Sequence, residues 1–259
     1  MVRPRTDTAM LSILPLTTLG EIAPRDDLGA LLAAAINDVG GAGDADILVV
    51  TQKIVSKSEG RFVDLRSVAP SPRALELAEV TRKDSRLVEL VLQESAAIVR
   101  AVPHVLITRH RLGFVMANAG IDQSNLGPGK EEHALLLPKN PDHSAAALRQ
   151  SIKLQLGVSV AVVITDSFGR PWRQGIVPVA IGAAGIASLH DRRGEADRDG
   201  RLLGVTQVAI GDLVAAAAGL VTGEGAEGVP AALIRGLTLP QGEHPASVLI
   251  RPFNEDLFP

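Results

Sequence analysis

The sequence contains no cysteine and no tyrosine, and its only aromatic residues are one tryptophan and five phenylalanines in 259 residues. Without cysteine there is no disulfide, no thiolate metal ligand and no cysteine nucleophile, which fits a cytoplasmic enzyme. With so few aromatic rings, the core must be built from alanine, valine, leucine and isoleucine.

Neither sign of charge is in large excess, since the sequence contains 26 Lys and Arg residues and 29 Asp and Glu residues. The net charge of -3 gives no electrostatic reason to expect nucleic acid or a membrane as a partner. The apolar run LVAAAAGLV (213–221) is shorter than the about 20 residues that cross a bilayer. The N-terminal MVRPRTDTAM has no apolar core after its arginines, so we expect no signal peptide. We expect a soluble, cytoplasmic protein.

Apolar residues make up 46% of the chain, so it is globular, and we treat residues 1–259 as one domain. Cap and proline signals predict four helices. They are 26–41, capped by Asp26 or Asp27 and ended by Gly40-Gly41; 71–81, starting at Ser71-Pro72; a helix from Asp84 through Ile98; and 144–157, ended by Gly157.

Short apolar runs predict the strands 46–50 and 160–165, and a hairpin of 104–109 and 113–118 turning at Leu112-Gly113. The segments 204–210, 212–221 and 231–236 read as strand, helix and strand. This mixture of helices, strands and hairpins predicts an α+β (mixed α/β) fold rather than a regular doubly wound sheet.

Acidic turns follow three apolar segments, in NAGIDQSN (118–125), TDSFGR (165–170) and TGEGAEG (222–228). Their Asp122, Asp166 and Glu224 offer the hard oxygen ligands that Mg²⁺ and Mn²⁺ prefer, and strand ends on one sheet edge can share an ion. Each turn alone is also explained as an ordinary Asx-turn or glycine loop, so the spacing alone does not decide.

Two further segments carry charge that suits phosphate. Lys53 and Lys57 lie one turn apart if TQKIVSKSEGR (51–61) is helical, although a solvated basic face explains them as well. Arg170 and Arg173 flank the only tryptophan, Trp172, which is either a core residue or a wall that keeps water from the site. We expect Gly169 and Pro171 to turn both arginines back over the metal ligands. No standard phosphate loop, H-x-x-x-H pair or G-x-S-x-G motif occurs.

Five ordered segments together resemble the coenzyme F420-0:L-glutamate ligase family, and the resemblance covers nearly the whole chain. They are DILVVTQKIVSKSEGR, NAGIDQSN, VITDSFGRPWRQG, VAIGAAGIA and TGEGAEGVPAALIRG. The resemblance implies a ligase that joins L-glutamate to the lactyl carboxylate of F420-0 and then adds γ-linked glutamates. It also implies GTP, an acyl phosphate, two Mg²⁺ or Mn²⁺ sites, room for K⁺, and a two-part fold in an intertwined homodimer.

The resemblance assigns site residues by position. Asp122 and Asp166 would bind one metal ion, and Ser167 and Glu224 the second. The catalytic set would be Asp166, Arg170 and Arg173. The residues expected around GTP are Leu19, Gly20, Glu21, Ile22, Gln52, Lys53, Lys57, Asn125, Thr222, Gly223, Gly225, Ala226 and Gly228.

Two features depart from parts of the family. Asp199, in ADRDG (196–200), stands where many members have tyrosine, which bears on the acceptor. Some relatives continue into a flavin-binding, nitroreductase-like domain, whereas this sequence ends at Pro259, so we expect no flavin. Three other functions stay open: a two-metal nucleotide phosphohydrolase, a glutamate ligase for a different carboxylate acceptor, and a non-catalytic nucleotide-binding or interaction protein.

Overall fold

The computed structural model describes residues 10–256, so residues 1–9 of the N-terminal segment discussed above lie outside the described residues. Its centre is a five-stranded mixed sheet in the order β1-β12-β2-β8-β9. The strands are β1 (Ser12–Pro15), β12 (Ala231–Arg235), β2 (Ile47–Thr51), β8 (Ala161–Arg170) and β9 (Arg173–Ala184). Only β2 and β8 pair in parallel, and every other neighbouring pair in this sheet is antiparallel.

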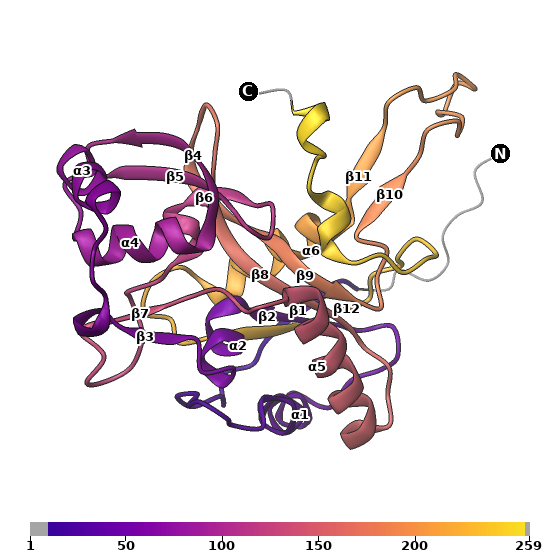
Figure 1. The fold of residues 1–259 in the computed structure, drawn as a ribbon. Helices are drawn as coiled ribbons and strands as arrows, with labels where there is room; N and C mark the ends of the chain where they lie inside the picture. Colours follow the sequence, from indigo (N-terminus) through magenta and orange to yellow (C-terminus); the bar gives the residue numbers. More distant parts are fainter. Residues whose placement is uncertain (1–9, 257–259) are drawn as a thin grey trace.

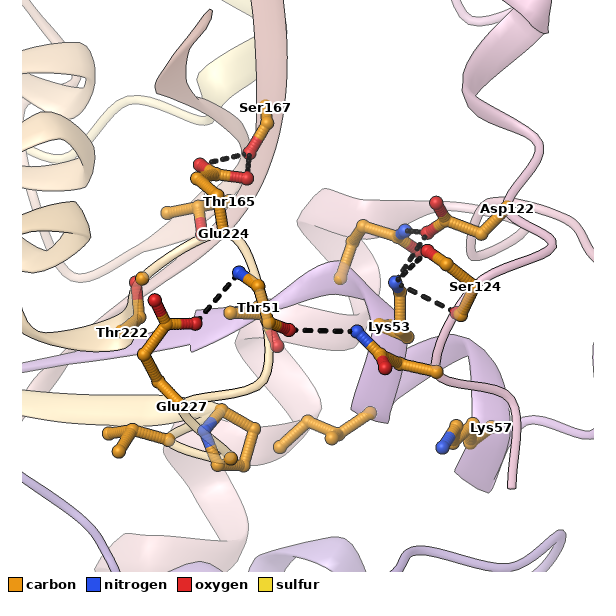
Figure 2. A pocket seen from close by; sticks show the side chains of 18 of the residues that line it. Thr51, Lys53, Lys57, Asp122, Ser124, Thr165, Ser167, Thr222, Glu224 and Glu227 are labelled. Carbon is orange, nitrogen blue, oxygen red and sulfur yellow. Dashed lines mark hydrogen bonds and ion pairs between the residues drawn. The ribbon is translucent and has the colours of Figure 1, made fainter. Parts of the chain in front are cut away.

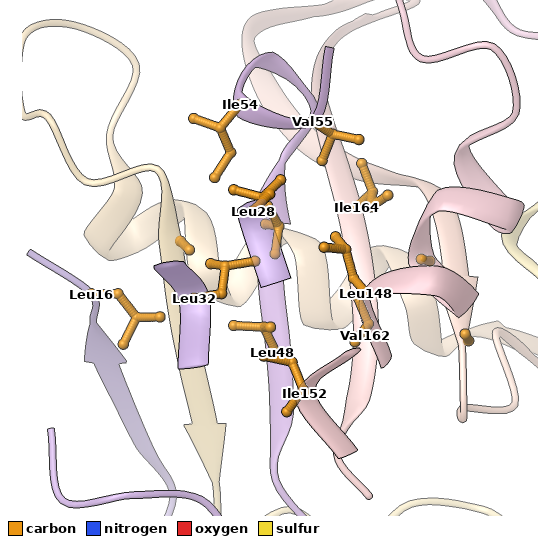
Figure 3. Close-up of a cluster of buried hydrophobic side chains, with 14 of the residues drawn as sticks. Leu16, Leu28, Leu32, Leu48, Ile54, Val55, Leu148, Ile152, Val162 and Ile164 are labelled. Carbon is orange, nitrogen blue, oxygen red and sulfur yellow. The ribbon is translucent and has the colours of Figure 1, made fainter. Parts of the chain in front are cut away.

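Alternate residues of the central strands enter two separate cores, because successive side chains of a strand point to opposite faces. Leu48, Val50, Val162 and Ile164 pack with α1 (Leu28–Asp38), α2 (Gln52–Ser58) and α5 (Pro141–Leu156) on one face, as Figure 3 shows. Ile47, Val49, Ala161 and Val163 pack with α6 (Ile210–Thr222) on the other. Because helices cover both faces of the central sheet, the ends of its strands are the open part of this unit.

A smaller unit lies beside the large sheet, and the predicted α+β, two-part fold is confirmed (Figure 1). It consists of α3 (Pro72–Thr81), α4 (Ser85–Glu94) and a three-stranded antiparallel sheet of β4 (Ser95–Val102), β5 (Val105–His110) and β6 (Val115–Ala117). Its own core joins α3, α4 and Leu106 of β5. The chain enters this unit after α2 through β3 (Phe62–Asp64) and leaves it through β7 (His133–Leu135), which pairs with β3.

Several short elements complete the fold. The hairpin of β10 (Leu189–Asp191) and β11 (Gln207–Ala209) projects from the large unit (Figure 1). The 3₁₀ turns are η1 (Leu65–Ser67), η2 (Asn118–Gly120), η3 (Ala246–Leu249) and η4 (Phe253–Glu255). Within residues 10–256, no helix is long and apolar enough to span a membrane.

Most predicted helix ends are confirmed by their caps. The Asp27 carboxylate accepts the Ala30 N–H at the start of α1, and Ser71 with Pro72 starts α3. Asp84 caps α4, and Gly157 ends α5 with the left-handed backbone (φ 73°) that favours glycine. The predicted hairpin of β5 and β6 also forms, with Gly113 in its turn at φ 96°.

Three predicted boundaries are wrong. The helix after Asp84 ends at Glu94, and Ile98 belongs to β4, because the Ser95–Val102 segment pairs with β5. The α5 helix begins at Pro141, with Asn140 rather than Ser144 as its cap. The strand that begins at Ala161 runs on to Arg170, since it pairs with β9 as far as the hairpin tip.

Candidate active site

One cavity of about 810 Å³ collects most of the predicted residues. Five segments far apart in the chain line it, and each contributes residues singled out from the sequence. These segments are Leu19–Ile22, Thr51–Ile54 with Lys57, Asp122 with Ser124 and Asn125, Thr165–Ser167, and Thr222–Pro230. Figure 2 labels side chains from the last four of these segments, which lie around the same space.

The parallel pairing of β2 and β8 places two of these segments at the same level. Thr51 and Thr165 are register partners, so Gln52 and Asp166 follow them side by side at the ends of the buried strand segments. The apolar segments before these residues are buried on both faces, which fixes where the polar side chains emerge. Asp166 and Ser167 lie within β8 itself, so the paired strand holds them.

Asp122 reaches the cavity from the smaller unit. Asn118, Ala119 and Gly120 all have positive φ (51°, 51° and 69°), and they turn the chain sharply after β6. The Asp122 N–H and C=O then pair with Leu135 at the start of the return to the large unit. The predicted carboxylate therefore lies on a braced backbone where the two units meet.

The carboxylates of Asp122 and Asp166 disfavour each other's charge. The pKa of the Asp166 carboxyl is raised to about 7, chiefly by burial, then by the negative charge of Asp122, with Glu224 adding to the effect. The Ser167 N–H donates to Asp166 Oδ1 at 2.8 Å, and this hydrogen bond lowers the pKa of Asp166. Burial also raises the pKa of Asp122, against the Lys53 ammonium. A divalent cation between them would relieve both penalties.

Ser167 and Glu224 form a second pair across the cavity. The Ser167 hydroxyl lies 2.6 and 2.7 Å from the two carboxylate oxygens of Glu224, which follows α6 in the glycine-rich loop (Figure 2). This hydroxyl and carboxylate are hard oxygen groups of the kind that bind Mg²⁺. Among residues 10–256, however, no three acidic or histidine side chains gather tightly enough to hold one ion. Each of the two pairs offers two protein oxygen ligands, and an ion at either pair would need further oxygens from the substrates.

The two lysines that were predicted to bind phosphate line the cavity. Both lie on α2 (Gln52–Ser58), so the predicted helix within residues 51–61 is confirmed. Lys57 is only 5% exposed in its side chain and pairs with the Glu21 carboxylate. The Lys53 ammonium lies 3.1 Å from the Ser124 carbonyl and 3.5 Å from Asp122 Oδ2. A solvated basic face does not describe either side chain.

The glycine-rich loop contributes backbone groups and one unexpected carboxylate. Asn125, with φ 55°, donates from Nδ2 to the Gly225 carbonyl at 3.1 Å, which ties two predicted segments together. Glu227 Oε2 accepts the Gly225 N–H at 2.7 Å, and such backbone donors lower the pKa of Glu227. Ser124 and Glu227 were missed from the sequence, since neither residue type stands out there.

The hairpin tip of β8 and β9 contradicts one prediction. Arg170 and Arg173 pair across the tip, and the Arg170 guanidinium donates to the Gln174 carbonyl at 2.9 Å. Neither arginine nor Trp172 lines the cavity, because Gly169 continues the strand instead of breaking it. Trp172 is 84% exposed, so it is neither a core residue nor a wall of this cavity. The catalytic role of the two arginines stays a prediction without support from this arrangement.

Asp199 also lies outside the cavity. It belongs to the exposed loop between β10 and β11, where its N–H and that of Arg201 donate to Asp197 Oδ1. These hydrogen bonds all form within the loop. The aspartate in place of the usual tyrosine at residue 199 therefore does not alter the set of residues that line the cavity.

Comparison with known proteins agrees with this geometry. The family described as F420-0:Gamma-glutamyl ligase matches residues 17–236, a range that includes every segment lining the cavity. A protein of Methanopyrus kandleri named Coenzyme F420:L-glutamate ligase is 44% identical over 96% of this chain and 97% of its own length. Proteins of the same name from Methanothermobacter thermautotrophicus (42%, 96% and 98%) and Methanocaldococcus jannaschii (45%, 83% and 85%) are similar to the chain as well.

Proposed function

Because the chain belongs to the F420-0:gamma-glutamyl ligase family, we propose that it forms an amide between L-glutamate and the lactyl carboxylate of F420-0. Further γ-linked glutamates would follow in coenzyme F420 biosynthesis in the cytoplasm. The relatives similar over nearly their whole length carry the name of a glutamate ligase, which supports this activity. The observation that carries it is the meeting of the Asp122/Asp166 pair, the Ser167/Glu224 pair and the glycine-rich loop in one cavity.

GTP is the proposed phosphate donor. Its triphosphate carries about four negative charges, and the cavity offers two lysines, Lys53 and Lys57, and backbone N–H groups of the loop 222–228. The cavity also contains Glu21, Asp122, Asp166, Glu224 and Glu227, so the lysines alone do not balance the charge. Two Mg²⁺ or Mn²⁺ ions, held by Asp122 with Asp166 and by Ser167 with Glu224, would neutralise phosphate oxygens when bound. A K⁺ site and the absence of a flavin remain expectations from the family resemblance alone.

The chemistry follows from two displacements. A carboxylate oxygen of the acceptor attacks the γ-phosphorus of GTP, and the bond to GDP breaks, which gives an acyl phosphate. The glutamate amine then attacks the acyl carbon. The bond between this carbon and the bridging oxygen breaks, phosphate leaves with that oxygen, and the amine nitrogen loses a proton. This chain's residues would hold the phosphates and keep the carboxylate in line, which is the usual enzymatic contribution to phosphoryl transfer.

One incubation tests the proposal. Purified protein with F420-0, glutamate, GTP and Mn²⁺ should yield a product heavier by one glutamyl residue in mass spectrometry. If the acceptor carboxylate carries ¹⁸O, one ¹⁸O atom should appear in the released phosphate. Phosphate release without glutamate, and without an amide product, would favour the phosphohydrolase instead.

We also propose a homodimer. Large apolar side chains are exposed on the β8–β9 hairpin and on α6, including Trp172 (84%), Leu213 (60%) and Leu220 (83%). Exposed apolar groups of this size are typical of surfaces that bind another protein. A second copy of the chain is the partner that the family resemblance implies.

A further inference from the structure

Gln52 is expected at the nucleotide, yet its side chain is committed elsewhere. It is 2% exposed, and it forms hydrogen bonds with the side chains of two other residues. Its Nε2 donates to Asp122 Oδ2 at 2.7 Å, and its Oε1 accepts from the Ser56 hydroxyl at 2.9 Å. Both ends of the amide are therefore occupied within the protein.

Asp122 determines which way this amide faces, and Ser56 holds the oxygen end of the amide in place. Ser56 follows Gln52 by one helical turn on α2, and it is fully buried. A hydroxyl hydrogen directed at Oε1 keeps the oxygen end of the amide on the helix and the NH₂ end toward Asp122. The reversed amide would place its oxygen against a carboxylate oxygen, and two acceptors cannot form a hydrogen bond.

The consequence for Asp122 is an asymmetric carboxylate. Gln52 and Lys53 both contact Oδ2, at 2.7 and 3.5 Å. Within residues 10–256, no hydrogen bond is made to Oδ1. One oxygen is thus held by protein donors, while the other has no hydrogen bond among the described residues. Ligating carboxylates are commonly oriented by a neighbouring hydrogen bond in this way.

We propose that Ser56 and Gln52 are positioning residues that hold Asp122 so that its Oδ1 meets a divalent cation. The Gln52 side chain then acts on the metal ligand, and Ser56 acts only through Gln52. This inference rests on the proposed metal site of the ligase. It assigns a role to Ser56, for which the sequence gives no signal apart from its spacing from Gln52.

Direct Mn²⁺ binding tests the inference without turnover. The electron paramagnetic resonance signal of free Mn²⁺ is titrated with the full-length protein in the absence of nucleotide. Loss of an outer partner of a metal ligand typically costs 10- to 100-fold in affinity. We therefore expect Ser56→Ala and Gln52→Met each to raise the Mn²⁺ dissociation constant about tenfold. Ser188→Ala is the matched control, since Ser188 is equally buried, donates one hydrogen bond to the His244 carbonyl and lies outside the cavity.

The double variant separates positioning from general loss of stability. In the Gln52→Met background, Ser56→Ala should cause no further loss of Mn²⁺ affinity, because its only route to Asp122 has been removed. An equal loss in both backgrounds, or an unchanged affinity in Ser56→Ala, overturns the inference. If Ser56→Ala does not fold, Gln52→Met alone decides, and wild-type affinity in that variant overturns it. A wild-type protein that binds no Mn²⁺ overturns the metal assignment of the proposed function as well.

Discussion

Asp166 combines a partly buried carboxyl group with two acidic neighbours, and this makes the metal-free protein sensitive to pH. Its pKa is about 7 in the folded protein and near 3.8 in the unfolded chain. Between these pH values the folded state holds a proton on Asp166 that the unfolded state lacks. The contribution of this group to the free energy of unfolding is therefore fully present below about pH 4 and is lost as the pH rises through 7. The loss amounts to a few kcal/mol, since each pKa unit corresponds to about 1.4 kcal/mol.

The melting temperature of metal-free protein should therefore fall between pH 5 and pH 8. In Asp166→Asn, which keeps the size and cannot ionise, this fall should be much smaller. Added Mn²⁺ should raise the wild-type melting temperature more at pH 8 than at pH 5, because the ion replaces the proton. Equal pH profiles of wild type and Asp166→Asn, measured by calorimetry without metal, would contradict the raised pKa.

Asp166→Asn should also abolish amide formation while the fold is retained. The amide offers a weaker, uncharged ligand where a carboxylate is needed beside Asp122. Product is measured by mass spectrometry and folding by circular dichroism. Wild-type activity in this variant, or in wild-type protein with excess chelator, would rule out the metal assignment.

Lys57→Ala should weaken GTP binding by roughly 1.5 to 3 kcal/mol if the ammonium contacts a phosphate oxygen. Glutamate binding should change less. The ammonium is buried beside Glu21, so its removal leaves an acidic group without its cation at the cavity. Isothermal titration with GTP checks the effect, and Lys153→Ala is the control, since Lys153 is exposed on α5 and lies outside the cavity. Equal GTP affinity in both variants would return Lys57 to a structural role.

The sequence alone predicted which acidic residues lie together in one cavity, but not the contacts that orient them. Asp122, Asp166 and Glu224 were found because each follows an apolar segment, and the cavity contains all three. The bonds from Ser56 to Gln52 and from Asn125 to Gly225 depend on side-chain orientation and on a contact between residues 100 positions apart. No local pattern encodes such contacts, and cap signals and periodicity describe only neighbours along the chain.

At the scale of elements, the docking of α5 on β9 depends on one glycine. A Cβ at Gly182 would lie 2.4 Å from the backbone carbon and oxygen of Pro141 in the first turn of α5. Backbone atoms cannot move aside as a flexible side chain does. Gly182→Ala should therefore lower the free energy of unfolding by about 1 to 3 kcal/mol. Gly204→Ala, where nothing lies within 4 Å of the added Cβ, should leave it nearly unchanged in the same urea titration.

Element prediction failed where pairing with a distant strand decided the outcome. The segment after Glu94 has helical spacing through Ile98, but β5 offers it a strand partner. Likewise, Gly169 reads as a strand breaker, whereas β9 supplies hydrogen-bonding partners along the whole hairpin. Caps were predicted well because they are set by residues within one turn of the helix end.

At the scale of the whole molecule, the exposed tip of the β8–β9 hairpin bears on assembly. We expect light scattering to give twice the chain mass, and Trp172→Ala to raise the dimer dissociation constant. Since the side chain is 84% exposed, the melting temperature of the monomer should change little. The ratio of released phosphate to amide should also stay constant, because Trp172 does not line the cavity. A lower melting temperature with unchanged assembly would contradict this assignment.

The two ligand pairs draw on segments that leave the ribosome at very different times. Asp122 and Asp166 are both translated before α6, whereas Glu224 and its loop are translated after that helix. β12, which lies between β1 and β2, also arrives after every other strand of that sheet. A growing chain therefore carries Asp122 and Asp166 before it has the Glu224 loop that lines the same cavity and the strand β12 that joins β1 to β2.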